Sequence, residues 1–521
     1  MNGSEADDAE AAAELLSQSF ARSSSRISPS VYETGRVVAI APWLEGHRER
    51  VEYLLRQQAA DGGWGISTAR LVPTLSATEA LLTIDTDAVG EELWNAAQGA
   101  VLLATDFLRN EISRASSADR LPDTVAIEFI VPALTIGINS VLEMEEGVEC
   151  IPMLAGSQVA RLAELRAAVS TGHPLPHKLW HSWETFGSSE GADLVHPEGG
   201  AVACSPAATA LWAGAQPEVP AETRRYFAEL NARDGGPVPV AAPMPHFERS
   251  WLLTTFAVHG VPHPALDEWL DVLDATLGPM GAAAGDGLPP DCDDTAMISS
   301  ALAMSGRRVD LKPLMSFFRD PHFQCYPGER TTSPSTNAHA LIALSAVAQR
   351  WGLASSTAAA ARSTTRWLVD QQRPDGSWED KWHLSPFYST WCSVEGLVAS
   401  AAFEPTDCAG DTWAADDAIA AAVEWMLHTR SSAGWGSVGE NLEETCYGAL
   451  VLSRAARPDQ VRAARPALLA ALTILDDVHP EETWPTLWIG KDLYTPQRVV
   501  QGIRLTARRV LRMMLATMAV A

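Results

Sequence analysis

The chain has few positive charges, no closely paired cysteines and no long apolar run, and each absence argues against a class of protein. Its 521 residues carry 38 lysines and arginines against 65 aspartates and glutamates, and the formal net charge of -27 repels nucleic acid and anionic membrane surfaces. Seven cysteines without a C-x-x-C pair indicate reduced thiols in a cytoplasmic protein rather than a disulfide framework. No run of about 18 apolar residues occurs, so we expect no integral membrane association.

Two familiar kinds of binding pattern are also missing. The chain contains neither a glycine-rich phosphate loop nor a zinc-spaced set of cysteines and histidines. Few stretches alternate polar and apolar residues as strands do, whereas alanine-rich stretches without glycine or proline favour helices. A chain of this length usually needs more than one hydrophobic core. The sequence therefore predicts an all-α protein of two domains.

One helix-turn unit recurs three times, each time with a tryptophan seven residues after a polar residue. The pairs are Gln57 and Trp64, Gln371 and Trp378, and, in a weaker copy, His428 and Trp435. A glutamine side chain can bond the free backbone groups at a helix end, and a tryptophan can cover the turn and pack between helices. Such repeats in an all-helical chain predict stacked helical hairpins.

Three carboxylates are crowded into residues 291–296, which read DCDDTA after two prolines and before an apolar helix. Asp291, Asp293 and Asp294 could simply cap that helix, because aspartate is favoured at the N-cap and in the first turn. Capping explains one or two acids better than three, and carboxylates can also bind Mg²⁺. Acid chemistry is the third interpretation, because neighbouring carboxyls that cannot all ionise together keep a proton at neutral pH.

With this motif the chain resembles the bacterial class II diterpene cyclases of the copalyl diphosphate synthase type, in the squalene-hopene cyclase superfamily. Their signature is D-x-D-D-T-A, and other segments resemble the family in the family's order. These segments read SVYET at 30–34, IEFIVP at 127–132, SPAATA at 205–210, FERSW at 247–251, STNAH at 335–339 and LWIGKDLY at 487–494. The tryptophan units resemble the QW motifs of terpene cyclases built from double α-barrels.

The resemblance implies two α-barrel (α/α toroid) domains, the family's β and γ units, with the active site between them. By the family pattern, residues 1–50 plus 255–521 form the β domain that carries the acid motif. Residues 51–254 then form the inserted γ domain.

The resemblance also assigns roles to the acids. Asp293 is the expected general acid, Asp291 and Asp294 hold and reload its proton, and Asn337 matches a hydrogen-bond partner of the acid. The expected reaction begins with protonation of the C14=C15 bond of geranylgeranyl diphosphate, and bicyclisation and deprotonation then give a labdane-type, copalyl-like diphosphate. One alternative is cyclisation of farnesyl diphosphate to a drimane-type product. Another is a non-catalytic α-barrel that binds an isoprenoid or a partner protein, in which the aspartates are only caps.

A base must end the reaction, and the resemblance offers one candidate. His181, in LWHSWE at 179–184, matches the L-H-S-x-E of plant ent-copalyl diphosphate synthases, in which the histidine pairs with an asparagine. Val240 occupies the aligned place of that asparagine, so the pair is incomplete in this chain.

The cation and the diphosphate each need partners. Aromatic faces stabilise cations by about 0.5–2 kcal/mol each. The aromatic candidates are Trp180, Trp251, Trp391 and Tyr388. Lys491 matches a family lysine expected at the diphosphate, and Arg498 is a weaker candidate, as is Glu128 for the site in general. The resemblance implies Mg²⁺ at the diphosphate, with unknown ligands, and no organic cofactor.

Class I terpene synthases ionise the diphosphate with Mg²⁺ on a D-D-x-x-D cluster. In this chain the pair at 416–417 is followed by Ala420 and the pair at 476–477 by Pro480, so neither cluster is complete. We therefore expect the diphosphate to remain in the product, which a downstream class I terpene synthase could then use.

Overall fold

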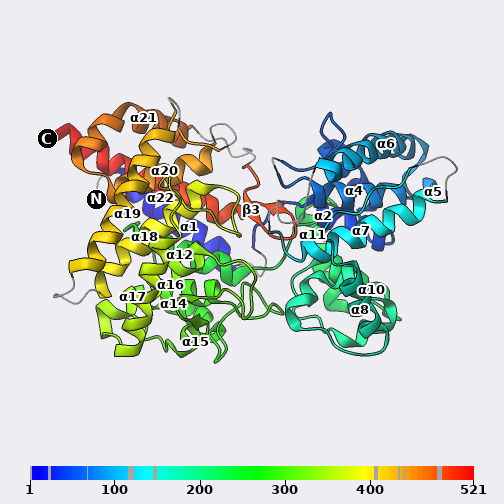
Figure 1. Cartoon of the computed structure of the whole chain (residues 1–521), viewed down its shortest axis with the longest axis horizontal. Coiled ribbons are helices and arrows are strands. Elements are labelled where there is room, and N and C mark those ends of the chain that lie inside the picture. Colours follow the sequence, from blue (N-terminus) through cyan, green and yellow to red (C-terminus); the bar gives the residue numbers. More distant parts are fainter. Residues whose placement is uncertain are drawn as a thin grey trace.

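The computed structural model describes residues 3–21, 25–66, 68–114, 123–144, 149–403, 409–431, 434–437, 441–477 and 484–520. Within these ranges the chain is mostly helical, and its two sheets are antiparallel hairpins with two residues in each strand. The prediction of an all-α fold is confirmed. Figure 1 shows two helical bodies side by side, and in the described part no helix is both long and apolar enough to cross a membrane.

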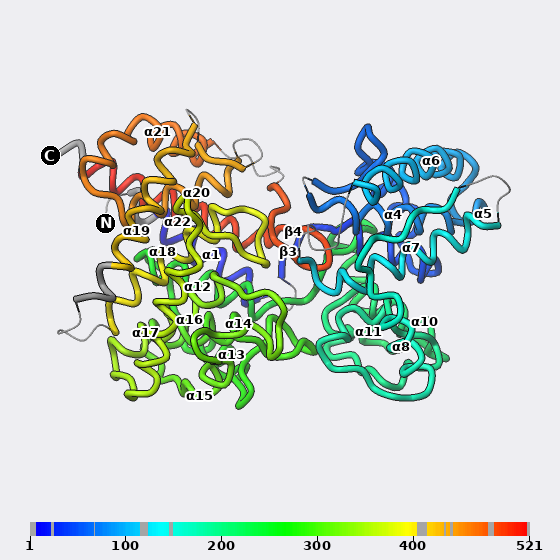
Figure 2. Tube along the Cα trace, in the orientation of Figure 1, coloured from blue at the N-terminus to red at the C-terminus, as the bar shows by residue number. Residues whose placement is uncertain are grey.

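The first body contains the helix at the N-terminal end and the elements of the C-terminal half of the chain, whose hairpin at residues 488–494 reaches across to the second body (Figure 2). Its elements are α1 (Gly3–Ala21), α12 (Pro245–Val258), α13 (Asp267–Thr276), α14 (Cys292–Met304), α15 (Lys312–Met315), β1 (Phe318–Arg319), β2 (His322–Phe323), α16 (Pro334–Trp351), α17 (Ser355–Asp370), α18 (Pro386–Ser400), η4 (Ala401–Phe403), α19 (Ala409–Thr429), α20 (Leu442–Ala455), α21 (Pro458–Asp476), β3 (Trp488–Ile489), β4 (Leu493–Tyr494) and α22 (Gln497–Val520). Helices α12, α14, α16, α18, α20 and α22 form a closed ring, because each packs against the next and α22 packs against α12.

Four helices of this ring begin at a polar N-cap residue. The caps are Asp291 for α14, Ser333 for α16, Ser385 for α18 and Asn441 for α20. Each side chain accepts a hydrogen bond from a backbone N–H in the first turn, a group that has no partner within the helix itself. The caps fix where each ring helix starts, and the first turns of α12, α14 and α18 contribute side chains to one cavity, described below.

The second body is formed by the chain between α1 and α12. Its elements are α2 (Val31–Ile40), α3 (His47–Gln57), α4 (Leu71–Leu82), α5 (Thr86–Val89), α6 (Glu91–Arg114), α7 (Ile127–Leu142), α8 (Val159–Ser170), η2 (His177–Ser182), α9 (Trp183–Phe186), η3 (Ser189–Leu194), α10 (Pro206–Gly214) and α11 (Ala221–Asp234). Helix α2 lies at its centre and packs against α3, α4 and α10.

The observed division of the chain corrects the expected boundaries at residues 50 and 254. Val38 of α2 packs with Trp64 in a core of the second body, whereas Leu252 of α12 packs with Leu16 of α1 in the first. The chain therefore passes between the bodies after α1 and again before α12. The family pattern gave the order of the segments but not the residues at which the chain passes from one body to the other. Apolar helices of the two bodies have similar sequences, so the pattern of apolar residues does not mark these positions.

The three tryptophan units close their turns in one common way. Each indole N–H donates to a backbone carbonyl of the preceding helix, at 2.6 Å for Trp64, 2.9 Å for Trp378 and 2.8 Å for Trp435. Each tryptophan backbone N–H donates to a threonine hydroxyl of the following helix. The glutamines that bind the turns are Gln58 and Gln372, each one residue after the glutamine used for the spacing. Their amides also bind carbonyls of α6 and α19, so the unit ties three helices together.

Candidate active site

A cavity of about 350 Å³ lies where the two bodies meet. The second body contributes Val125, Glu128, Phe129, Lys178, Leu179 and His181, and the segment between α11 and α12 contributes Val240 and Met244. The first body contributes Phe247, Trp251, Leu288, Asp291, Asp293, Asp294, Tyr326, Glu329, Trp382, Tyr388, Trp488 and Tyr494. The walls are mainly apolar and aromatic, so the acid motif opens into an apolar space.

Asp291 both caps α14 and belongs to the acid cluster. Its Oδ1 accepts the backbone N–H of Asp294 at 2.8 Å, which is the capping interaction expected of an aspartate at this position. Its Oδ2 accepts the hydroxyl of Tyr326, in the segment between β2 and α16, at 3.2 Å. The capping interpretation is therefore correct for Asp291, but it does not account for Asp293 or for the side chain of Asp294.

The two outer carboxyls hold protons more tightly than exposed aspartates do. Burial, and also the charge of Asp293, raise the pKa of Asp291 to about 7. Burial and the neighbouring charge of Asp291 raise the pKa of Asp294 well above its ordinary value. Asp294 Oδ1 is buried and has no hydrogen-bond partner in the described part of the chain, as fits a carboxyl that stays neutral. The cluster can thus keep protons at neutral pH beside Asp293.

Asp293 lines the cavity and contacts a histidine that sequence reasoning missed. Nδ1 of His339, on α16, lies 2.7 Å from Oδ1 of Asp293. The side chains are 5% and 14% exposed, respectively. The indole of Trp251 meets the His339 ring edge-on, with 5.3 Å between ring centroids. His339 lies in the STNAH segment that signalled the family, but from that segment the sequence analysis selected Asn337 instead.

The structure corrects the expected contact between Asn337 and the acid. Both amide donors of Asn337 are used by backbone carbonyls, that of Phe323 at 3.0 Å and that of Ser333 at 2.9 Å. Its Oδ1 accepts the backbone N–H of Phe323 at 2.7 Å. Asn337 therefore fastens β2 to the start of α16, and His339, half a turn further along α16, is the residue that reaches Asp293.

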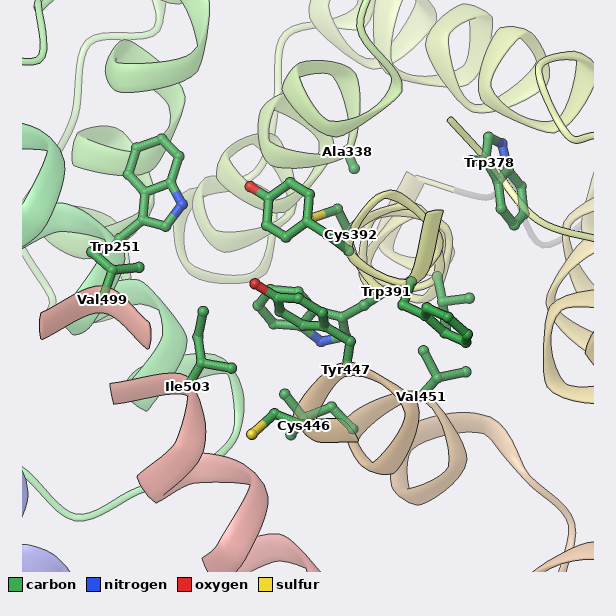
Figure 3. Packing of buried hydrophobic residues seen from close by; sticks show 14 of the residues in the cluster. Trp251, Ala338, Trp378, Trp391, Cys392, Cys446, Tyr447, Val451, Val499 and Ile503 are labelled. Atoms are coloured by element: carbon green, nitrogen blue, oxygen red, sulfur yellow. The ribbon is translucent and has the colours of Figure 1, made fainter. Parts of the chain in front are cut away.

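The aromatic candidates divide into two groups. Trp251 and Tyr388 line the cavity, as expected. Trp391 lies outside the lining, where it stacks on Tyr447 of α20 with 5.3 Å between ring centroids (Figure 3). Trp180 is half-buried in the second body beside His177 and does not line the cavity either. Sequence reasoning missed the other lining aromatics, among them Phe247 in the FERSW segment, and Trp488 and Tyr494 in the LWIGKDLY segment.

His181 lies in the cavity wall in a form suited to accept a proton. Its Nδ1 is 2.8 Å from the carbonyl oxygen of Ala203, and because a carbonyl can only accept, Nδ1 carries the hydrogen. The other ring nitrogen, Nε2, then carries the lone pair. Burial, and also the charge of Lys491, lower the pKa of His181 to about 3, so the ring is neutral at neutral pH. Val240 lines the same cavity, and no asparagine stands in its place.

Neither of the two expected diphosphate cations lines the cavity. The Lys491 side chain is fully buried and pairs with the carboxylates of Glu33 and Glu184. Arg498 is buried and donates to Glu248 at 2.9 Å. These cations are committed to carboxylates of the protein, which corrects their expected placement at the substrate. Among the described residues that line the cavity, the lysine is Lys178, an exposed residue three positions before His181.

The carboxylates outside the acid motif offer little for an all-protein metal site. In the described part of the chain no group of three or more histidine, cysteine, aspartate or glutamate side chains is placed to hold a metal ion. Glu329 in the cavity wall is paired with Lys381 at 2.6 Å. Glu128, in the first turn of α7, is the remaining lining carboxylate of the second body. This donor set fits Mg²⁺ only if a substrate supplies most of the ligands.

Comparison with known proteins places this geometry among terpene cyclases. The family model of the squalene-hopene cyclase C-terminal domain matches residues 329–478. The chain is 38% identical over 502 residues to the ent-copalyl diphosphate synthase of Streptomyces sp. strain KO-3988, and the match covers 94% of each chain. It is 34% identical to the terpentedienyl-diphosphate synthase of Kitasatospora griseola, over 93% of this chain and 97% of that protein. The structure of the ent-copalyl diphosphate synthase of Streptomyces platensis matches with a TM-score of 0.86 and 38% identity, over 96% of this chain and 99% of that one.

Proposed function

The chain belongs to the class II diterpene cyclases related to copalyl diphosphate synthase, and we propose that it protonates geranylgeranyl diphosphate and cyclises it to a labdane-type diphosphate. The observation that carries the proposal is Asp293 in the wall of an apolar cavity, held by His339 and flanked by two carboxyls with raised pKa values.

Protonation of an alkene needs an acid whose conjugate base is well stabilised. Asp293 would give its proton to C14 of the C14=C15 bond, because this leaves the more stable, tertiary cation at C15. The carboxylate left behind accepts the Nδ1–H of His339, and the N-terminal end of α14 further favours negative charge there. Asp291 and Asp294, which hold protons of their own, would reload Asp293.

The later steps use the walls of the cavity. The faces of Trp251, Tyr388 and Trp488 would stabilise the moving positive charge, and the apolar lining keeps water away from it. We assign termination to His181, whose Nε2 lone pair would take the proton from the carbon next to the final cation as the C–H electrons form the alkene.

The diphosphate end of the substrate would bind at the second-body side of the cavity. Lys178 supplies positive charge there, against the negative charge of the whole protein. Glu128 would hold a Mg²⁺ ion together with diphosphate oxygens, and the ion would supply further positive charge to the diphosphate. The D-D pairs at 416–417 and 476–477 do not line the cavity, which supports a reaction that leaves the diphosphate in place.

The product would then be a substrate for an enzyme that ionises allylic diphosphates, such as a class I terpene synthase. We also propose a cytoplasmic location, supported by the free thiols of the six described cysteines.

Incubation with isoprenoid diphosphates of 15, 20 and 30 carbons tests the proposed function. We expect the 20-carbon substrate to give a bicyclic alcohol by mass spectrometry, and only after phosphatase treatment, because the diphosphate stays in the product. A cyclic hydrocarbon formed without phosphatase would contradict the proposal, and turnover of the 15-carbon substrate alone would reassign the enzyme to drimane-type products.

The acid cluster predicts a descending pH profile. Burial raises the pKa of Asp291 to about 7, so its carboxyl is protonated below that pH and ionised above it. An ionised Asp291 removes the proton store and weakens Asp293 as an acid, so kcat should fall about tenfold per pH unit above pH 7. Because the fold binds this proton more tightly than the unfolded chain does, the thermal midpoint should fall as pH rises from about 4 to 7, and this contribution should level off above pH 7. A kcat that increases through pH 7 at saturating substrate would contradict this account.

We predict that a substitution of Lys178 affects substrate binding but not the chemical step. Replacement of Lys178 by alanine should raise KM about tenfold and change kcat little, because a diphosphate contact made in both ground and transition states affects binding alone. The matched control is Lys312→Ala, which removes an exposed lysine of α15 that does not line the cavity. Unchanged KM in Lys178→Ala would show that the diphosphate binds elsewhere.

A further inference from the structure

Lys491 belongs to the first body but is bound entirely by groups of the second. It lies between β3 and β4, and its ammonium pairs with Glu33 of α2 and with Glu184 of α9, the latter at 3.0 Å. The same Nζ donates to the Ser205 hydroxyl at 2.9 Å and to the carbonyl oxygen of His181 at 2.8 Å. With its side chain 0% exposed, Lys491 binds groups that are 286 or more positions away in the sequence.

Each partner of this ammonium fixes another part of the second body. Ser205 is the N-cap of α10, and Glu33 accepts the backbone N–H of Ala207 at 2.7 Å in the first turn of that helix. Glu184 accepts the hydroxyl of Tyr32 at 2.7 Å. The buried carboxylates need a cation, because an unpaired charge in an apolar interior is unstable. Lys491 therefore holds α2, α9, α10 and the His181 segment at fixed distances from the β3–β4 hairpin.

The same hairpin forms one wall of the cavity, and His181 forms another. Trp488, Ile489 and Gly490 line the cavity immediately before Lys491. The carbonyl of Gly490 accepts the backbone N–H of Val125 at 2.9 Å, so the two bodies are also joined on that side. The hydrogen bond from the Lys491 ammonium to the His181 carbonyl is thus a direct link between the hairpin wall and the segment that carries the His181 ring.

We propose that Lys491 is a positioning residue that determines which proton is removed at the end of the reaction, by holding the His181 segment against the β3–β4 hairpin. The inference rests on the proposed function and on His181 as the terminating base. With His181 in place, its Nε2 takes one particular proton, and the C–H electrons close one particular double bond. With His181 displaced, a different neighbouring proton is lost, or water adds to the cation and then loses a proton to give an alcohol.

The test compares two variants that differ only at Lys491. Lys491→Met combined with Glu33→Gln removes one charge of each sign, and the glutamine retains an oxygen for Ala207. Glu33→Gln alone is the matched control, because it keeps the bond from Lys491 to His181. Products of geranylgeranyl diphosphate are dephosphorylated and separated by gas chromatography–mass spectrometry, and circular dichroism and thermal unfolding verify the fold.

We expect Glu33→Gln to give the wild-type product ratio, and the double variant to turn over substrate but to lower the ratio of the main product to its isomers or alcohols by about tenfold or more. His181→Ala should shift the ratio in the same direction. A folded double variant with the control's product ratio would overturn the proposal. A folded double variant without turnover would also overturn it, because Lys491 would then serve the substrate or the acid.

A second pair of variants, again differing only at Lys491, is compared if the double variant does not fold. Glu184→Gln is added to both proteins, so that no buried charge lacks a partner in the triple variant. If the triple variant also fails to fold while Glu33→Gln/Glu184→Gln folds, Lys491 is structural only and the proposal is wrong. If the wild-type protein itself forms no diphosphate product from geranylgeranyl diphosphate, the proposed function is wrong. This result is distinct from a change in the product ratio of the variants, which tests the role of Lys491.

Discussion

Asp293→Asn will lower kcat with geranylgeranyl diphosphate by about 10³-fold or more, while the protein stays folded. Asparagine has the size of aspartate and can still accept a hydrogen bond from His339, but it has no acidic proton to give to an alkene. Asp291 cannot take over without movement, since its carboxyl oxygens are bound by the α14 backbone and by Tyr326. The measurement is product formed per unit time at saturating substrate, after dephosphorylation.

The control for this variant is Asp416→Asn, which changes an exposed aspartate of α19 away from the cavity. It should retain wild-type kcat. A thermal midpoint of Asp293→Asn close to that of the wild type shows that the loss is chemical. If Asp293→Asn retains most of its activity, the aspartates are helix caps and the general acid lies elsewhere.

His339→Ala will lower kcat by about 10²-fold, and it will do so without removing the acid itself. The Nδ1–H of His339 stabilises the carboxylate that remains when Asp293 has given up its proton. Without this hydrogen bond the carboxylate loses that stabilisation, and a 10²-fold fall in kcat corresponds to about 2.7 kcal/mol in the barrier. Because His339 belongs to the first body and Lys178, the proposed diphosphate partner, to the second, KM should change little.

His339→Asn tests whether the hydrogen bond or the volume of the ring matters, because the asparagine amide can still donate to Asp293 if it reaches. Partial recovery relative to His339→Ala is the expected result. His428→Ala, which removes an exposed histidine of α19, should be indistinguishable from the wild type. Equal activity of His339→Ala and the wild type would mean that the contact with Asp293 does not strengthen the acid.

The acid motif was readable from the sequence because its information is local. Three carboxylates within four residues and the apolar helix after them marked the motif, and the family resemblance selected Asp293 among the three as the expected general acid. Its partner was not readable, since the contact between Asp293 and His339 spans 46 positions and depends on how α14 packs against α16. Asn337 and His339 are two residues apart on one helix, and only the rotation of that helix decides which one faces the acid.

The lysine expected at the diphosphate shows the same limit, because the sequence does not reveal which negative group a lysine binds. A lysine in a recognisable segment could serve either a substrate or a buried carboxylate, and sequence does not distinguish the two. Lys491 proved to be buried between Glu33 and Glu184, which lie hundreds of positions before it in the chain. Lys178 lies near His181 in the sequence and in the cavity wall, and that proximity was the available signal for it.

Asp291 uses its two oxygens for two purposes, one to start α14 and the other to receive the hydroxyl of Tyr326. Directed evolution at this position would therefore alter helix stability and acid strength together, and selection for one would disturb the other. Tyr326 separates them: Tyr326→Phe leaves the cap intact and changes only the environment of the carboxyl. An engineer who wants to adjust how readily the enzyme starts its reaction should begin with that hydroxyl.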